Sequence, residues 1–114
     1  MARQRNSKRC AEYFGYNDEE GRPRVFRIGQ IPVPYELRPH AGTANHAICF
    51  EWGKGGAAAE VLGLTILADY LKDEALAVRL NPVFTRSVIL KLRRGRYWQL
   101  RLADIETALA RHAA

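Results

Sequence analysis

The stretch Phe50-Glu51-Trp52-Gly53-Lys54-Gly55-Gly56 separates two halves of the chain that have different patterns. It leads directly into an Ala- and Leu-rich block, residues 57–72, which contains only three charged side chains. A segment with so many apolar positions is typical of a helix that is buried on most sides. We therefore predict that residues 57–72 form the central helix of the core and that residues 47–52, which end at the glycines, form a strand.

The half before this stretch carries the pattern of strands. Two short apolar runs, at residues 13–14 and 25–28, lie on either side of a turn-rich segment at residues 17–21. This arrangement predicts a hairpin whose second strand starts at Pro23. Three prolines between residues 29 and 39 then indicate an extended segment that can run along a sheet edge, followed by a loop over residues 40–45.

The half after the central helix shows further helical periodicity. Asp73 can cap a short helix over residues 74–80, and Asn81 can cap another that has Pro82 at its first position and ends near residues 93–95. A short strand at residues 97–100 and a last helix over residues 103–112 complete the pattern. The expected fold is α+β: a small antiparallel sheet from the N-terminal half packs on the central helix, with two or three shorter helices.

Length and composition indicate one domain that needs no metal or disulfide. A chain of 114 residues can bury a sufficient core. We assign residues 10–114 to this domain and expect residues 1–9 to be a flexible basic arm, because they are polar and show no apolar periodicity. With no apolar leader and no stretch long enough to span a bilayer, we expect a cytoplasmic protein in which Cys10 and Cys49 are free thiols.

The net charge of +6 is concentrated in two places. Residues 1–9 carry four cations and residues 91–101 carry five, both without an acid, so the remainder of the chain is slightly acidic. The second cluster could bind nucleic acid, because cations neutralise phosphates and the adjacent Tyr97 and Trp98 can stack on bases. The alternative is that these cations only face the negative end of a helix dipole.

The sequence offers no recognised catalytic or metal-binding motif. His46 and Cys49 lack a second pair of ligands, and no nucleophile motif surrounds either cysteine. We therefore expect no cofactor, no metal and no enzymatic activity, and instead a protein that binds another protein, with nucleic-acid binding as the alternative. The candidate partner-binding residues are the cations of two stretches: Arg22, Arg24, Arg27, Arg86, Lys91, Arg93, Arg94 and Arg96.

The glycine-rich stretch is a candidate anion site. Gly53, Lys54, Gly55 and Gly56 precede the central helix, where free N–H groups and the helix dipole can hold a phosphate. The stretch lacks the Ser or Thr of a phosphate-binding loop. The alternative is that the glycines only allow a tight turn and close packing of the strand end on the helix.

Part of the second half resembles a known family. The similar positions, between residues 50 and 109, are residues 50–53, 55–56, 64, 66–71, 84, 88, 92, 98, 100 and 105. In these positions the chain is similar to the family of unknown function numbered 6166, which contains small bacterial, plasmid and phage proteins. This chain departs from the family in having Lys54 in place of an aromatic residue and Arg101 in place of a threonine that caps the last helix.

The resemblance implies a setting rather than a chemistry. The family brings no activity, cofactor or catalytic residue. It implies a bacterial cell or a mobile element, where small proteins often bind and block or adapt a larger machine. We accordingly expect a phage- or plasmid-encoded inhibitor or adaptor whose partner is a larger protein of the host's defence or the element's maintenance.

Overall fold

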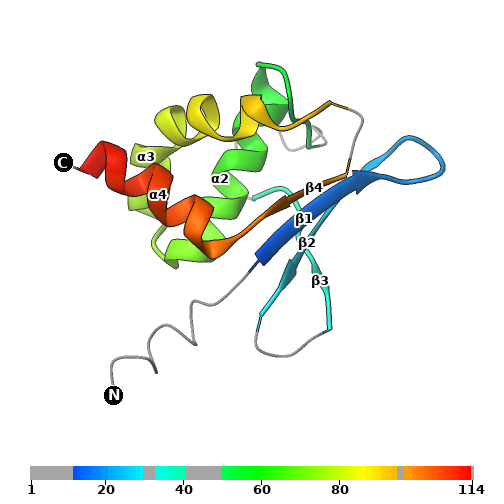
Figure 1. Cartoon of the computed structure of the whole chain (residues 1–114), viewed down its shortest axis with the longest axis horizontal. Helices are drawn as coiled ribbons and strands as arrows, with labels where there is room; N and C mark the ends of the chain where they lie inside the picture. Colours follow the sequence, from blue (N-terminus) through cyan, green and yellow to red (C-terminus); the bar gives the residue numbers. More distant parts are fainter. Residues whose placement is uncertain (1–11, 30–32, 41–49, 95–96, 114) are drawn as a thin grey trace.

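A computed structural model describes residues 12–29, 33–40, 50–94 and 97–113. A four-stranded sheet has the order β3-β2-β1-β4, and every neighbouring pair is antiparallel. All the described helices lie on one side of this sheet (Figure 1). The α+β prediction is confirmed. The elements are β1 (Glu12–Asn17), β2 (Pro23–Ile28), β3 (Tyr35–Glu36), α2 (Ala57–Leu71), α3 (Glu74–Ser87), the 3₁₀ helix η1 (Ile89–Lys91), β4 (Trp98–Leu100) and α4 (Leu102–Ala113).

The predicted hairpin of β1 and β2 is confirmed, including its start at Pro23. Asp18 forms its turn, because its carboxylate accepts the backbone N–H groups of Glu20 and Arg22, both at 2.9 Å. Gly21 adopts a φ of 81°, a left-handed conformation that favours glycine. The proline-rich segment supplies β3 at the sheet edge, as its prolines predict.

The fourth strand comes from the other end of the chain. β4 pairs with β1, so that Trp98 lies opposite Gly15 and Leu100 lies opposite Tyr13. The sheet is therefore not built from the N-terminal half alone. Trp98 is buried against the backbone of Gly15, and its ring centre lies 5.5 Å from that of Trp52 in a T-shaped contact.

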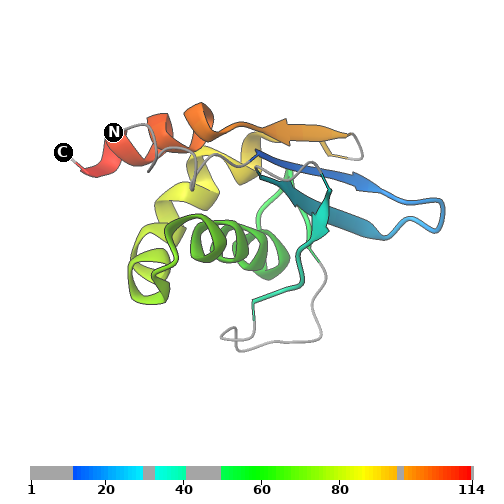
Figure 2. The same cartoon turned by 90° about the horizontal axis from the view of Figure 1, so that it is seen from below.

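Helix α2 is the core helix that the sequence predicts. Nine of its residues are buried, and it ends at Lys72, whose φ of 57° closes the last turn. Gly63 marks its close crossing with α3, because a Cβ atom there would lie 2.3 Å from Oγ1 of Thr85 and 2.4 Å from Oδ1 of Asn81. Figure 2 shows α2 and α3 adjacent in the helical layer.

Helix α3 is one continuous helix where the sequence predicts two, one over residues 74–80 and another that starts at Asn81. Asp73 caps it as expected, accepting the N–H of Leu76 at 3.0 Å. Asn81 is wrong as a cap, because the helix continues through it and Pro82 to Ser87. The side chain of Asn81 instead donates to the carbonyl of Glu60 on α2 at 3.0 Å. The carbonyl that Pro82 leaves without an N–H partner belongs to Val78, which is exposed, so water can satisfy it.

Two other expectations need correction. Residues 50–52 are not a strand; they run as irregular chain, and residues 47–49 lie outside the described part. This segment is held by a backbone hydrogen bond of another kind: Gly53 donates its N–H to the carbonyl of Ile89 at 3.0 Å. At the start of α4, Arg101 lacks a capping side chain, but its own N–H donates to the carboxylate of Asp104 at 2.9 Å, which forms half of a capping box.

Asp69 ties the sheet to α2. It accepts hydrogen bonds from the hydroxyl of Tyr13 and from Nη1 of Arg27, both at 2.6 Å, and Nζ of Lys72 lies 3.6 Å away. Tyr13 is completely buried. Its burial, together with the hydrogen bond to Asp69, raises the pKa of the Tyr13 hydroxyl above its usual value of 10.0.

Tyr13→Phe should change how stability depends on pH. In the unfolded chain Tyr13 loses its proton near pH 10.0, whereas the fold holds it protonated. The unfolded state thus binds fewer protons above that pH, so this group makes stability fall by about 1.4 kcal/mol per pH unit. Urea unfolding at about pH 8, 10 and 11 should show a steeper decline for the wild type than for the variant. A constant difference between the two proteins across this range would contradict the role of Tyr13.

Candidate functional site

The alternation of side chains along β1 and β2 leaves aromatic residues on the face of the sheet that lies away from the helices. Phe14 and Phe26 are directly opposite each other on the two central strands, and Tyr16 lies two residues along from Phe14. Tyr97, just before β4, adds a fourth ring. We call these four residues the aromatic patch.

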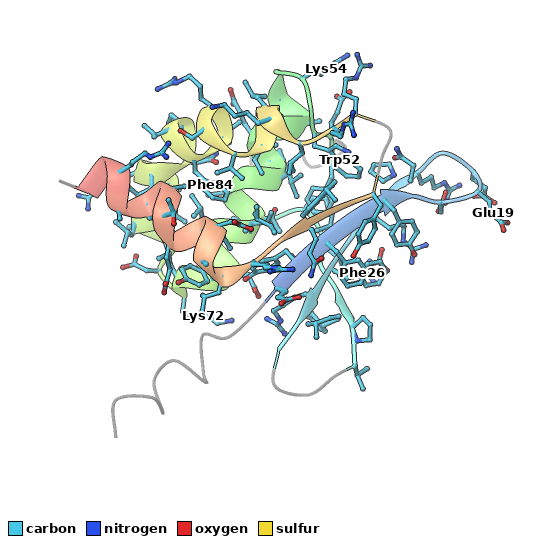
Figure 3. All side chains as sticks on the ribbon, in the orientation of Figure 1. Glu19, Phe26, Trp52, Lys54, Lys72 and Phe84 are labelled. Atoms are coloured by element: carbon cyan, nitrogen blue, oxygen red, sulfur yellow. The ribbon has the colours of Figure 1, made fainter. Side chains whose placement is uncertain are left out.

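The rings of the aromatic patch are in contact. Phe26 lies almost parallel to Phe14, at 12° with 5.2 Å between ring centres, and to Tyr16, at 4° and 6.0 Å. The ring of Tyr97 is 6.1 Å from that of Phe14. Tyr97 is 60% exposed and the other three are half-buried. Figure 3 shows Phe26 on the side of the strands away from the helices, and none of the described helices covers it.

Charged residues of both signs border the patch. Arg24 lies with its guanidinium 5.6 Å from the centre of the Phe26 ring and forms two hydrogen bonds with Glu36. Arg24 also pairs with Asp18 at 3.6 Å, and the amide of Gln99 donates to Glu12 at 2.7 Å. The guanidinium holds the pKa of Glu36 below its usual value, so the border is ionised and internally paired.

The structure divides the arginines that the sequence grouped on the hairpin. Arg22 is exposed in the turn and pairs with Glu20 at 3.4 Å. Arg24 borders the aromatic patch. Arg27 points to the opposite face, where it binds Asp69 and lies 4.8 Å from the ring centre of Tyr35. Arg27 thus has a structural partner and does not contribute to one surface with Arg24.

The second predicted group of cations lies around η1. Arg86 is in the last turn of α3, Lys91 is in η1, and Arg93 and Arg94 follow it. All four are exposed, and none forms an ion pair with an acidic side chain of the described part. Arg96 lies outside the described residues.

In the glycine-rich stretch, close packing occurs at Gly53. Gly53 adopts a φ of 78°, and a Cβ atom there would lie 2.4 Å from Cγ of Arg94. Gly56 stands at the start of α2 with a φ of 125° and no capping side chain. Lys54 lies 3.6 Å from the carboxylate of Glu51. The contact at Gly53 is one that the tight-turn interpretation predicts. The anion site at Gly53, Lys54, Gly55 and Gly56 stays a prediction.

Two further tests apply only to the described residues. No group of three or more His, Cys, Asp and Glu side chains among them is placed to hold a metal ion. No helix among them is long and apolar enough to cross a membrane. His46 and Cys49, for which the sequence offers no second pair of ligands, lie outside the described residues, as do Cys10 and residues 1–9 of the predicted arm.

A comparison with sequence models of protein families shows to which family the chain belongs. The sequence model of a family of unknown function, DUF6166, matches residues 13–111. The chain belongs to this family. The DUF6166 match includes the hairpin and so extends further towards the N-terminus than the resemblance seen in residues 50–109. Searches of curated proteins and of solved structures found no match.

The DUF6166 match thus also covers the aromatic patch, which sequence reasoning did not identify. The sequence pattern that could have indicated the aromatic patch is the period-two alternation in residues 12–16 and 24–28. The sequence predicts both Tyr13 and Phe14 as strand residues of a hairpin, but it does not show which face of the sheet the helices cover. The position of Tyr97 beside Phe14 depends on the pairing of β4 with β1, which no local pattern shows.

Proposed function

We propose that this DUF6166 protein is a non-enzymatic module that binds another protein through its aromatic patch. The observation that carries the proposal is the contiguous row of four rings on a sheet face that no described helix covers. Interfaces are enriched in Tyr, Phe and Arg at their centre and have a polar border, which is the composition of this face.

The geometry of the rings favours a protein partner over nucleic acid. A base stacks on the free face of an aromatic ring. Phe26 is nearly parallel to Phe14 and Tyr16, at 5.2 and 6.0 Å between ring centres, so these three rings cover part of one another's faces in offset stacks. The border of the patch is also internally paired, because Arg24 is bound to Glu36 and is thus not free to bind a phosphate.

The setting of this function is also part of the proposal. We propose a cytoplasmic inhibitor or adaptor, encoded by a phage or plasmid, that acts on a larger protein of host defence or plasmid maintenance. The support is the family resemblance, because small proteins of bacteria and mobile elements often bind and block or adapt a larger machine.

Tyr97→Ser should weaken binding to the protein partner by about 30-fold, equivalent to about 2 kcal/mol, because it removes the most exposed ring of the aromatic patch. Tyr97 is 60% exposed, so the substitution should leave the fold intact. Val78→Ser is the matched control, because Val78 is 54% exposed on α3, away from the patch. The partner is captured from host lysate and purified, and its Kd is then measured for the wild type and both variants.

Equal affinity for the wild type and Tyr97→Ser, or equal loss in both variants, would overturn the proposed interface. If the captured material is instead removed by nuclease, the nucleic-acid alternative applies. In that case affinity should fall steeply with salt, and replacing Arg93 and Arg94 by alanine should reduce the salt slope.

A further inference from the structure

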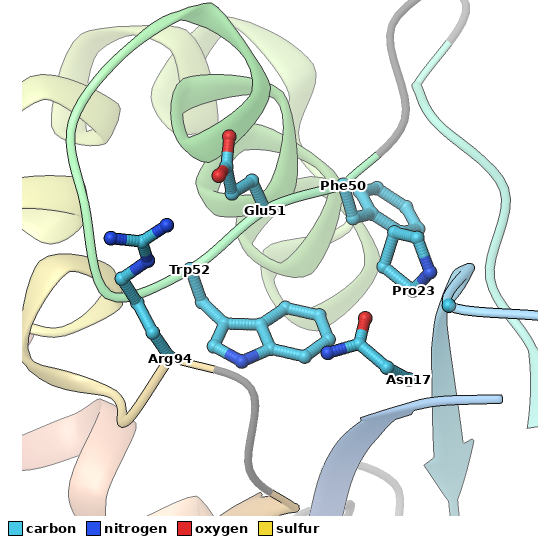
Figure 4. Close-up of a pocket in the computed structure, with 7 residues that line it drawn as sticks. Asn17, Pro23, Phe50, Glu51, Trp52 and Arg94 are labelled. Carbon is cyan, nitrogen blue, oxygen red and sulfur yellow. The ribbon is translucent and has the colours of Figure 1, made fainter.

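A hollow of about 290 Å³ lies where the end of the hairpin extends past the helical layer. It is on the helix side of the sheet and does not include the aromatic patch. Figure 4 shows its lining, which comes from the hairpin, from the chain before α2 and from the chain after η1. We call it the junction hollow, and its main lining residues are Asn17, Pro23, Phe50, Glu51, Trp52 and Arg94.

The floor of the junction hollow is apolar and preformed. Trp52 is 3% exposed and Phe50 is 6% exposed, so both rings are held in the core and present only a small surface. Trp52 is held in addition by its edge contact with Trp98. A hollow of about 290 Å³ is at the small end of ligand sites, so it suits one ring or one side chain.

Polar groups stand at the two ends of this floor. Figure 4 shows Arg94 and Asn17 at opposite ends of the Trp52 indole, while the carboxylate of Glu51 points away from that indole. The stem of Arg94 is in place because Gly53 has no Cβ atom: one there would lie 2.4 Å from Cγ of Arg94. Packing on the backbone of Gly53 thus fixes the start of the Arg94 side chain, whereas the residue as a whole is exposed.

The charge at the Arg94 end favours an anion. Arg94 forms no ion pair with a described acidic residue. The single carboxylate of the lining, Glu51, already has Lys54 at 3.6 Å. Two cations thus stand against one carboxylate. A guanidinium can bind a second carboxylate through two parallel hydrogen bonds.

We infer that the junction hollow binds an amphipathic carboxylate, meaning a carboxylic acid with one apolar group. Arg94 holds the carboxylate, the rings of Trp52 and Phe50 contact the apolar group, and the amide of Asn17 hydrogen-bonds a polar group at the far end. This chemistry has two sources, a small organic acid or the C-terminal residue of a peptide. The inference does not depend on the proposed protein-binding function.

Phenylacetate and its neutral analogue phenylacetamide test the inference on the full chain. We expect phenylacetate to bind with a Kd of about 1 mM and phenylacetamide to bind at least about tenfold more weakly. The readout is tryptophan fluorescence, because only one of the two tryptophans, Trp52, lines the hollow. Arg94→Gln should abolish the preference for the acid, whereas Arg86→Gln, an exposed arginine outside the hollow, should preserve it.

A peptide pair distinguishes the two sources. N-acetylglycyl-phenylalanine as the free acid is compared with its C-terminal amide. Tighter binding of the peptide acid than of phenylacetate identifies a peptide C-terminus as the source, and weaker binding identifies a small acid. The inference is overturned if neither acid binds saturably up to about 20 mM, far above the expected Kd, or if Arg94→Gln leaves acid binding unchanged. Neither arginine variant alters the aromatic patch, so this failure is distinct from failure of the protein-binding proposal.

Discussion

Gly15→Ala should destabilise the protein by about 3 kcal/mol, at the upper end of the usual range for overpacked sites. A Cβ atom at Gly15 would lie 2.6 Å from two carbons of the Trp98 indole and 2.7 Å from its nitrogen. Trp98 cannot move away easily, because it is buried and in contact with Trp52. Since domains of this kind are stable by only about 5–15 kcal/mol, this change should remove a large part of the total.

The sign of the effect makes this prediction specific. Alanine is normally better than glycine in a strand, by about 0.5–1 kcal/mol, so local preference alone predicts a more stable protein. Urea unfolding followed by circular dichroism measures the difference. Gly55→Ala is the control, because no atom lies within 4 Å of its added Cβ, and it should change stability by less than about 0.5 kcal/mol. A Gly15→Ala protein as stable as the wild type would mean that Trp98 does not pack on β1.

Gly63→Ala should be the second large loss, about 2 kcal/mol. The added Cβ atom would lie 2.3 Å from Oγ1 of Thr85 and 2.4 Å from Oδ1 of Asn81. Neither oxygen is free to move, because Thr85 donates to Asn81 at 2.8 Å and Asn81 donates to the Glu60 carbonyl at 3.0 Å. The alanine must therefore either separate α2 from α3 or break this chain of hydrogen bonds.

A second-site variant tests the cause of that loss. Thr85→Ala in the Gly63→Ala background should recover part of the stability, because it removes the closer of the two oxygens. The four proteins of this double-mutant cycle, compared by urea unfolding, give the coupling between the two sites. Helix propensity alone predicts the opposite result, a gain of about 1 kcal/mol from Gly63→Ala. Such a gain would show that the helices do not cross closely at this point.

Those parts of the fold that depend on residues close together in the sequence could be predicted from it. The hairpin follows from alternation around a turn-rich segment, and α2 follows from its apolar run. Asp73 is a cap because its side chain reaches an N–H only three residues away. Asn81 carries the same local signal but is inside a helix, since its hydrogen bonds go to Thr85 and to Glu60 on α2. The tertiary partner is what outweighs the local preference.

The candidate site depends mostly on contacts that the sequence does not show. Alternation places Arg24 and Arg27 on opposite faces of the same strand. Only the hydrogen bond from Arg27 to Asp69 on α2 shows that Arg27 is on the face that the helices cover. Tyr97 was predicted in a strand, yet its contact with Phe14 joins residues far apart in the chain. The cation cluster at Lys91, Arg93 and Arg94 was visible as charge. Its role cannot be derived from charge alone.

The pairing of β4 with β1 also sets an order on folding during synthesis. Tyr13 is synthesised long before its partner Leu100. Until then β1 lacks a neighbour on one side, and Trp52 lacks the indole against which it packs. Sheets closed by such distant segments form slowly, because the loop must close before the contacts stabilise it. A nascent chain therefore holds its hairpin and central helix without β4 until residues 98–100 have been made.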